Sequence, residues 1–237
     1  MKPPTPPPIK KQSTFRARVT GDKFQDFEGS FPFFMYDIIE VFEQLIQARE
    51  SEMGGIDLEC TIASMIAAFS DTKDDYGKYE ALVDELQKDD SRLCGLLRSA
   101  PFYEEGKPDG WVRFQYMALW SMLLCNGDAK LKAKIFYHIL QDGSGGQEWI
   151  AFDDKDFKPG FYLLLDIAVK FPLAQTDDAR KDDNFDEAYE TVADQFLDEV
   201  FDVDSKLDRT DWEQRVCKNS QWIFDPAALR KLVLEDN

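Results

Sequence analysis

The chain has 237 residues, a formal net charge of −18, 43% hydrophobic residues and 14% aromatic residues. This length fits one large domain or two small ones, and the apolar fraction is high enough for a buried core, which excludes a disordered chain. An acidic surface repels nucleic acid and anionic lipid, so neither is expected as a partner.

Residues 1–22 differ in composition from the rest of the chain. Five of the first eight residues are prolines, which prevents a helix and favours polyproline II. Within the first twenty residues there are five bases (Lys2, Lys10, Lys11, Arg16 and Arg18) and no acid; since the whole chain carries −18, the rest carries −23. We interpret this segment as a disordered basic tail or as a docking arm for an acidic surface such as a microtubule. The acidic body suits a basic partner such as a cationic helix, or serves solubility alone.

Apolar residues recur at helical spacing through most of the chain after residue 35. In the run 36–48, for example, Ile38, Phe42 and Leu45 fall on one face. Alternating strand patterns are nearly absent, so the sequence predicts an all-α fold. The predicted helices span residues 36–48, 61–69, 79–87, 92–98, 115–125, 131–140, 158–171, 185–200, 212–217 and 226–234.

The predicted helices occur in pairs around short polar loops, which is typical of a repeated helix–loop–helix unit. The loops are centred near residues 49–58, 104–114, 142–154 and 200–210. We expect two pairs of such units, each pair linked by a short β-bridge. The first pair is expected in residues 23–126, and the second pair with a trailing helix in residues 127–237. Residues 175–184 are charged and poor in apolar side chains, which predicts an exposed connection.

The second loop, residues 105–116, fits the frame of a calcium-binding EF-hand loop. In that frame oxygens at positions 1, 3, 5, 7, 9 and 12 hold the ion, and glycine at position 6 makes a sharp turn. Gly110 falls at position 6, and Val112 falls at position 8, where the backbone pairs with the neighbouring loop. Asp109 is at position 5, but Lys107 at position 3 and Tyr116 at position 12 supply no carboxylate. This loop is therefore predicted not to bind calcium.

The first and third loops are also predicted to be degenerate. With Gly54 and Ile56 at positions 6 and 8, the first loop has Arg49 at position 1 and Cys60 at position 12, neither of which suits a hard cation. In the third loop, Phe152 at position 8 puts Asp156 at position 12 and leaves Gly145 and Gln147 at preceding ligand positions. Starting the third loop at Asp142 instead requires about three extra residues.

The fourth loop is the most acidic of the four. With Leu207 at position 8, Asp202, Asp204 and Asp211 fall at positions 3, 5 and 12, and Val200 falls at position 1. The favoured interpretation is an acidic capped loop. The alternative is one weak calcium or magnesium site held by these three carboxylates, and no other cofactor is expected.

The sequence does not predict an enzyme, because it lacks a nucleophile elbow, a P-loop and an HExxH motif. Its single histidine, His138, lies in an amphipathic helical run. Cys60, Cys94, Cys125 and Cys217 are widely spaced, which favours reduced, buried thiols in a cytosolic protein over a zinc site or a disulfide framework. No apolar run reaches the ~20 residues of a membrane span, and the proline-rich start lacks the apolar region of a secretory signal.

Residues 111–136, which include the link Asn126-Gly127, resemble the middle of neuronal calcium sensor and calcineurin B-type proteins. In those families the exiting helix of the second hand leads through a short glycine-containing link into the third hand. Residues 185–228 resemble their fourth hand and its trailing helix. The extended acidic link before the fourth hand is most similar to calaxin-like proteins, which are subunits of the outer dynein arm docking complex on ciliary doublet microtubules. The resemblance is a pattern of hydrophobic positions over residues 35–235, and it implies EF-hand architecture and a place in the axoneme of cilia.

Paired EF hands can hold a partner's amphipathic helix in an apolar groove. The residues expected to line this groove are Met65, Phe69, Met117, Trp120, Met122, Phe161 and Leu165. Ordinary core packing is the alternative for each of them. Without functional ion loops, the protein is expected to be a constitutive scaffold subunit that binds an amphipathic or coiled-coil helix. The second hypothesis is a calcium or magnesium sensor, or a regulatory light chain, that acts through the fourth loop.

Overall fold

The computed structural model describes residues 23–51, 59–71, 77–143, 149–151, 157–176, 183–202 and 204–235. The fold is mostly helical, as expected. The α-helices are α1 Lys23–Glu28, α2 Ile38–Ser51, α3 Ile62–Ser70, α4 Glu80–Gln87, α5 Arg92–Leu97, α6 Phe114–Leu124, α7 Ala129–Gly143, α8 Phe157–Leu165, α9 Phe171–Gln175, α10 Asp186–Phe201, α11 Arg209–Asn219 and α12 Pro226–Glu235. A π-helical turn, η3 (Asp166–Lys170), joins α8 to α9, and a 3-10 turn, η4 (Gln221–Phe224), precedes α12.

Two elements near the start of the described chain were not expected from the sequence. They are α1 and the 3-10 turn η1, Pro32–Met35. Neither is long enough to show a helical period, since α1 has six residues and η1 has four. The predicted basic tail, residues 1–22, lies outside the described residues.

Two short antiparallel sheets connect loops that are distant in sequence. Strand β1 (Glu59–Thr61) pairs with β2 (Trp111–Arg113), and β3 (Ile150–Ala151) pairs with β4 (Lys206–Leu207). Val112 and Leu207 lie in these pairings, as expected for position 8.

The partners of Val112 and Leu207 correct two of the expected loop frames. Cys60, not Ile56, lies opposite Val112, and Ile150, not Phe152, lies opposite Leu207. Counting from Cys60 moves position 12 of the first loop from Cys60 to Ser64.

Side-chain caps determine where two of the exiting helices begin. Thr61 accepts a hydrogen bond from the Ser64 backbone N–H, and the Ser64 hydroxyl accepts one from the Thr61 N–H, which makes a capping box at α3. Asp208 accepts a hydrogen bond from the Asp211 N–H at 2.9 Å and caps α11. Thr61 is the last residue of β1, and Asp208 directly follows β4. The two caps therefore fix the direction in which each helix leaves its loop.

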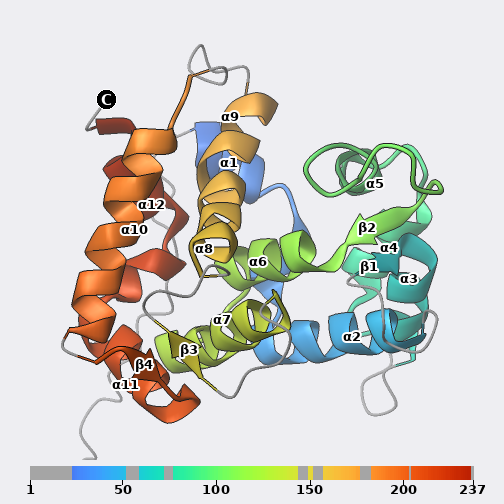
Figure 1. Ribbon diagram of the computed structural model, residues 1–237. Coiled ribbons are helices and arrows are strands. Elements are labelled where there is room, and N and C mark those ends of the chain that lie inside the picture. Colours follow the sequence, from blue (N-terminus) through green and yellow to red (C-terminus); the bar gives the residue numbers. More distant parts are fainter. Residues whose placement is uncertain are drawn as a thin grey trace, which may run out of the picture.

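The predicted boundary near residues 126 and 127 falls in the short link between α6 and α7, and these two helices pack against each other (Figure 1). Gly127 is required there because a Cβ would lie 2.5 Å from the Ile38 side chain. All four cysteines are free; Cys217 is half-buried and the other three are buried. Within the described residues, no helix has the length and apolar character needed to cross a bilayer.

Candidate functional site

The seven side chains expected to line a groove are all buried. Their exposed fractions are at most 2%. They are Met65, Phe69, Met117, Trp120, Met122, Phe161 and Leu165. In this structure they contact other parts of the same chain, as the alternative of ordinary core packing expects, and a groove formed by these residues stays a prediction.

Trp120 belongs to a group of three aromatic rings, which we call the aromatic cradle: Phe102, Trp120 and Phe171. The ring of Phe102 lies 5.1 Å from that of Trp120 and 5.0 Å from that of Phe171, and the last two rings are 5.6 Å apart. Phe102 precedes β2, Trp120 lies on α6, and Phe171 begins α9. The cradle therefore lies where the N-terminal and C-terminal halves meet.

The cradle is covered by residues 23–35, which comprise α1 and η1 and which we call the plug segment. Phe31 and Phe33 approach Trp120 at 4.9 and 5.2 Å, and Phe27 approaches Phe171 at 5.6 Å. All three contacts are edge-to-face, a geometry that aromatic quadrupoles favour. In Figure 1, α1 lies beside α9, and the two helices are in contact. The plug segment thus covers Trp120, one of the seven residues that the sequence assigned to a partner groove.

Two arginines hold the plug segment from its sides. The Arg92 guanidinium lies over the rings of Phe27 and Phe31, at 4.9 and 5.5 Å. Arg230, on α12, donates to both carboxylate oxygens of Glu28 at 2.7 and 3.2 Å, and to the Ala168 carbonyl at 3.0 Å. Arg230 is only 4% exposed, so the ion pair with Glu28 compensates a charge that would otherwise be buried and unpaired.

Other predicted groove residues lie in separate clusters. Phe161 belongs to a C-terminal aromatic cluster made of Phe136, Phe157, Phe161, Phe196 and Trp212, in which its ring is stacked 5.0 Å from that of Phe196. Phe69 contacts Tyr79 at 5.2 Å on the N-terminal side. The structure does not bring Trp120, Phe161 and Phe69 into one aromatic group.

In the fourth loop, an arginine side chain contacts one of the three carboxylates expected to bind a cation. Arg215, from α11, donates to the carbonyls of Val200 and Phe201 at 3.2 and 2.9 Å and forms an ion pair with Asp204. Asp202 and Asp211 are exposed. In the described residues, no group of three or more histidine, cysteine or acidic side chains could hold a metal ion. The structure therefore does not assemble Asp202, Asp204 and Asp211 as a ligand set.

The second loop repeats this arrangement. Its acid at position 5, Asp109, lies 3.3 Å from Arg98, which also pairs with Asp89 at 2.7 Å. Gly110 has the positive φ of 83° that the sharp turn requires. In the second and fourth loops alike, the carboxylate at position 5 is thus neutralised by an arginine. Parts of the first and third loops, residues 52–58, 144–148 and 152–156, lie outside the described residues.

A buried cation lies at the C-terminal end of α6. Lys132, on α7, is 7% exposed, and its ammonium lies 3.5 Å from the Leu123 carbonyl. Burial lowers the pKa of Lys132 to about 8. A cation at this position interacts favourably with the carbonyl end of the α6 dipole, which partly offsets the unfavourable desolvation.

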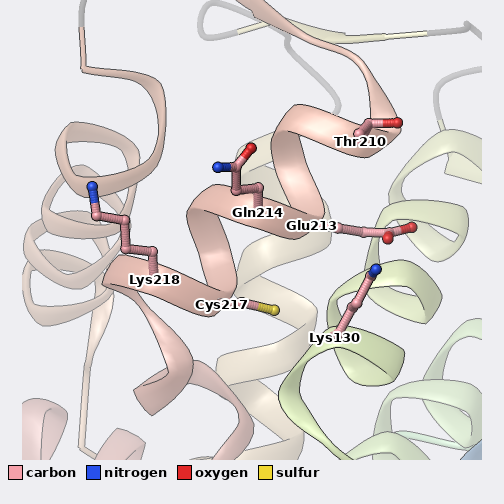
Figure 2. A pocket seen from close by; sticks show the side chains of 6 residues that line it. All are labelled: Lys130, Thr210, Glu213, Gln214, Cys217 and Lys218. Atoms are coloured by element: carbon pink, nitrogen blue, oxygen red, sulfur yellow. The ribbon is translucent and has the colours of Figure 1, made fainter.

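A surface depression between α7 and α11 is lined by Lys130, Thr210, Glu213, Gln214, Cys217 and Lys218. Figure 2 shows Lys130 and Glu213 pointing toward each other from the two helices, with Cys217 beside them and Lys218 on the far side of α11. Burial raises the pKa of the Cys217 thiol, and the nearby carboxylates of Asp128 and Glu213 add to this shift. A protonated thiol is a poor nucleophile, so the depression has no group prepared for covalent chemistry. His138 lies half-buried on α7, outside this lining.

No protein-family model matches the chain, and neither a curated protein nor a solved structure matches it. The resemblance to calaxin-like and other EF-hand families therefore stays a prediction that rests on the sequence pattern.

Sequence reasoning missed the plug segment and the four arginines Arg92, Arg98, Arg215 and Arg230. Phe24 and Phe27 were a signal for a single helical turn, because residues three apart share a helix face, although two residues do not establish a period. The arginine contacts left no such signal, since Arg230 and Glu28 are 202 residues apart.

Proposed function

We propose that this chain is a non-enzymatic EF-hand-like subunit that binds a protein partner without an ion switch. The single observation that carries the proposal is the pairing of Asp204 with Arg215 in the fourth loop, repeated by Asp109 with Arg98 in the second. A guanidinium on the position-5 carboxylate supplies the positive charge that calcium supplies in an ordinary loop. The loop then keeps its closed form at any calcium concentration.

The strand pairings support an EF-hand-like interpretation of the fold. In each of the two sheets, the paired strands come from loops between helices, and each strand leads into the next helix, namely α3, α6, α8 or α11. Position 9 of the first and fourth loops, Thr61 and Asp208, caps the exiting helix from the same place in the frame. Paired hands of this kind offer apolar surfaces to helices, and the aromatic cradle is such a surface.

A calcium or magnesium sensor acting through the fourth loop is the second candidate. It is disfavoured because an incoming divalent cation would have to displace Arg215 from Asp204. Like charges at one site repel each other. An axonemal docking complex is the setting that the resemblance to calaxin-like proteins implies, and it enters here as part of the proposal.

The test is a pull-down from ciliated-cell extract with the full chain as bait, in the presence of either calcium or a chelator. We expect the same partner, with coiled-coil or dynein-associated components, in both conditions. Thermal unfolding of the purified chain should also give the same midpoint with calcium and with chelator. Partner recovery only with calcium, together with a calcium-dependent rise in the midpoint, would support the sensor and reject the ion-independent subunit.

A further inference from the structure

The plug segment has the properties of a bound peptide more than those of a framework helix. Its helix α1 has six residues, and an isolated helix this short is unstable in water because nucleation is unfavourable. Its conformation therefore depends on the surface beneath it. The segment also directly follows residues 1–22 and precedes α2, so its withdrawal interrupts no later element of the fold.

The surface under the plug segment favours particular types of side chain in the segment that binds to it. Trp120 and Phe171 receive aromatic rings edge-on, and Arg92 lies over two of those rings. Such contacts favour aromatic side chains over aliphatic ones of similar size. Arg230 requires a carboxylate, because it is buried and donates to both oxygens of Glu28. A segment that fits here must bring aromatic rings and an acid together.

We propose that the aromatic cradle, with Arg92 and Arg230, is the partner-binding surface, and that its partner is a segment carrying phenylalanines about one helical turn apart and a carboxylate that replaces Glu28. This inference rests on the proposed function and names the partner's chemistry. In the structure, the plug segment occupies the surface in place of that partner. The partner segment is acidic and aromatic at this surface, in contrast to the cationic helix that the net charge alone suggested.

Competition between the plug segment and a partner follows from the connectivity. A tethered segment has an effective concentration in the millimolar range, so a free segment of equal intrinsic affinity binds only weakly. A partner displaces the plug segment if it makes better contacts with the cradle, or if the plug segment itself has been weakened. A partner without a carboxylate is rejected, because it would leave Arg230 buried and unpaired.

The test uses a fluorescently labelled peptide that copies residues 23–36 and the full chain in four forms. These are the wild type, F27A/F31A, E28Q and the matched control F34A. Phe34 lies in the same segment but is 52% exposed, so its removal does not uncover the cradle. By anisotropy, the peptide should bind F27A/F31A about tenfold more tightly than the wild type. E28Q should show a smaller gain, and F34A should match the wild type. A peptide carrying F27A and F31A should not bind any form.

Equal peptide binding by all four forms, or no binding to a folded F27A/F31A or E28Q chain, would overturn the proposal. Failure of both F27A/F31A and E28Q to fold would also overturn it, because the plug segment would then be part of the framework. The proposed function is judged separately. If the partner captured in the pull-down binds regardless of calcium and is not displaced by the peptide, the subunit role stands and the cradle is not its binding surface.

Discussion

The aromatic cradle and the C-terminal aromatic cluster are both groups of buried rings, but they are closed in different ways. In the C-terminal cluster, every ring projects from one of four helices that pack on each other, α7, α8, α10 and α11, with lengths of nine to sixteen residues. Phe157 and Phe196 stack with an interplanar angle of 3°, and the Trp212 indole donates to the Ala133 carbonyl at 3.0 Å. In the cradle, the covering rings come from a six-residue helix, a four-residue turn and Phe31, which lies between them.

This difference distinguishes the helices of the C-terminal cluster, which form the framework, from the plug segment, which occupies the cradle. The C-terminal cluster cannot open without separating helices that carry the rest of the half-molecule. The cradle can open by releasing the plug segment, to which few other elements are attached. Local opening therefore requires less free energy than global unfolding. The experiments below test this distinction, from the largest expected effect to the smallest.

The sharpest mutational comparison uses two phenylalanines of equal burial. Phe196 is 0% exposed in the C-terminal cluster, and Phe31 is 2% exposed over the cradle. We expect F196A to lower the free energy of unfolding by about 3–5 kcal/mol, as large-to-small core substitutions do. F31A should lower the free energy of unfolding by at least about 1 kcal/mol less than F196A does. The reason is that F31A can remove only the stability of the closed plug segment. Urea denaturation measures the free energy of unfolding of both variants. Equal losses would show that the plug segment is as much a part of the framework as the C-terminal cluster.

The junction between the two regions contains the buried Lys132, which predicts a pH dependence. Its pKa is lowered from 10.5 to about 8 in the folded chain, so between these values the unfolded chain binds more protons than the folded one. Stability from this group is therefore expected to rise as the pH rises from about 8 to 10.5, by up to about 3 kcal/mol.

The variant K132M isolates the contribution of this group. The nearby Lys132 lowers the pKa of Cys125, but burial raises that pKa so strongly that the thiol stays protonated over this pH range in both folded chains. The advantage of K132M over the wild type should be largest below pH 8 and should shrink by about 3 kcal/mol by pH 10.5. Urea denaturation across this pH range gives the difference. A difference that stays constant with pH would show that Lys132 is not buried as a charged group.

The smallest effect concerns the arginine of the fourth loop, beside the C-terminal cluster. R215Q removes an ion pair with Asp204 and hydrogen bonds to two carbonyls at the end of α10. We expect a loss of about 1 kcal/mol, because the group is partly exposed and screened by solvent.

The matched control is R209Q, on the same helix. Arg209 lies 3.4 Å from Glu213 four residues along, and such a surface pair contributes about 0.3–0.5 kcal/mol. Differential scanning calorimetry should therefore show a clearly larger decrease in midpoint for R215Q than for R209Q. Equal decreases would mean that Arg215 does not organise the loop.

The sequence predicted the helices well because long amphipathic runs such as those of α2, α7 and α10 carry a clear period. Val112 and Leu207 were placed correctly because both are apolar and lie at the right distance from their helices. The frames of the first and third loops were wrong by four and two residues, respectively. The first loop was aligned on Gly54, because the sequence alone does not show which residue pairs with Val112.

The candidate site was predicted less completely than the fold. Trp120 was among the predicted groove residues, but the sequence could not show that Phe31 and Phe33 would cover it. Those contacts span about ninety residues, and only the folded chain brings them together. The pairing of Arg215 with Asp204 was missed because the loop frame considers only oxygen ligands, whereas the positive charge comes from the following helix.

The most direct test of the occupant role of the plug segment is native-state hydrogen exchange of the wild-type chain. Backbone amides of residues 24–36 should exchange through a local opening, with less protection than the amides of α10 and α11, and their exchange should show little dependence on low concentrations of urea. Protection of residues 24–36 equal to that of α10 and α11, with the same urea dependence, would mean that the segment leaves only when the whole protein unfolds, and would contradict its role as a replaceable occupant of the cradle.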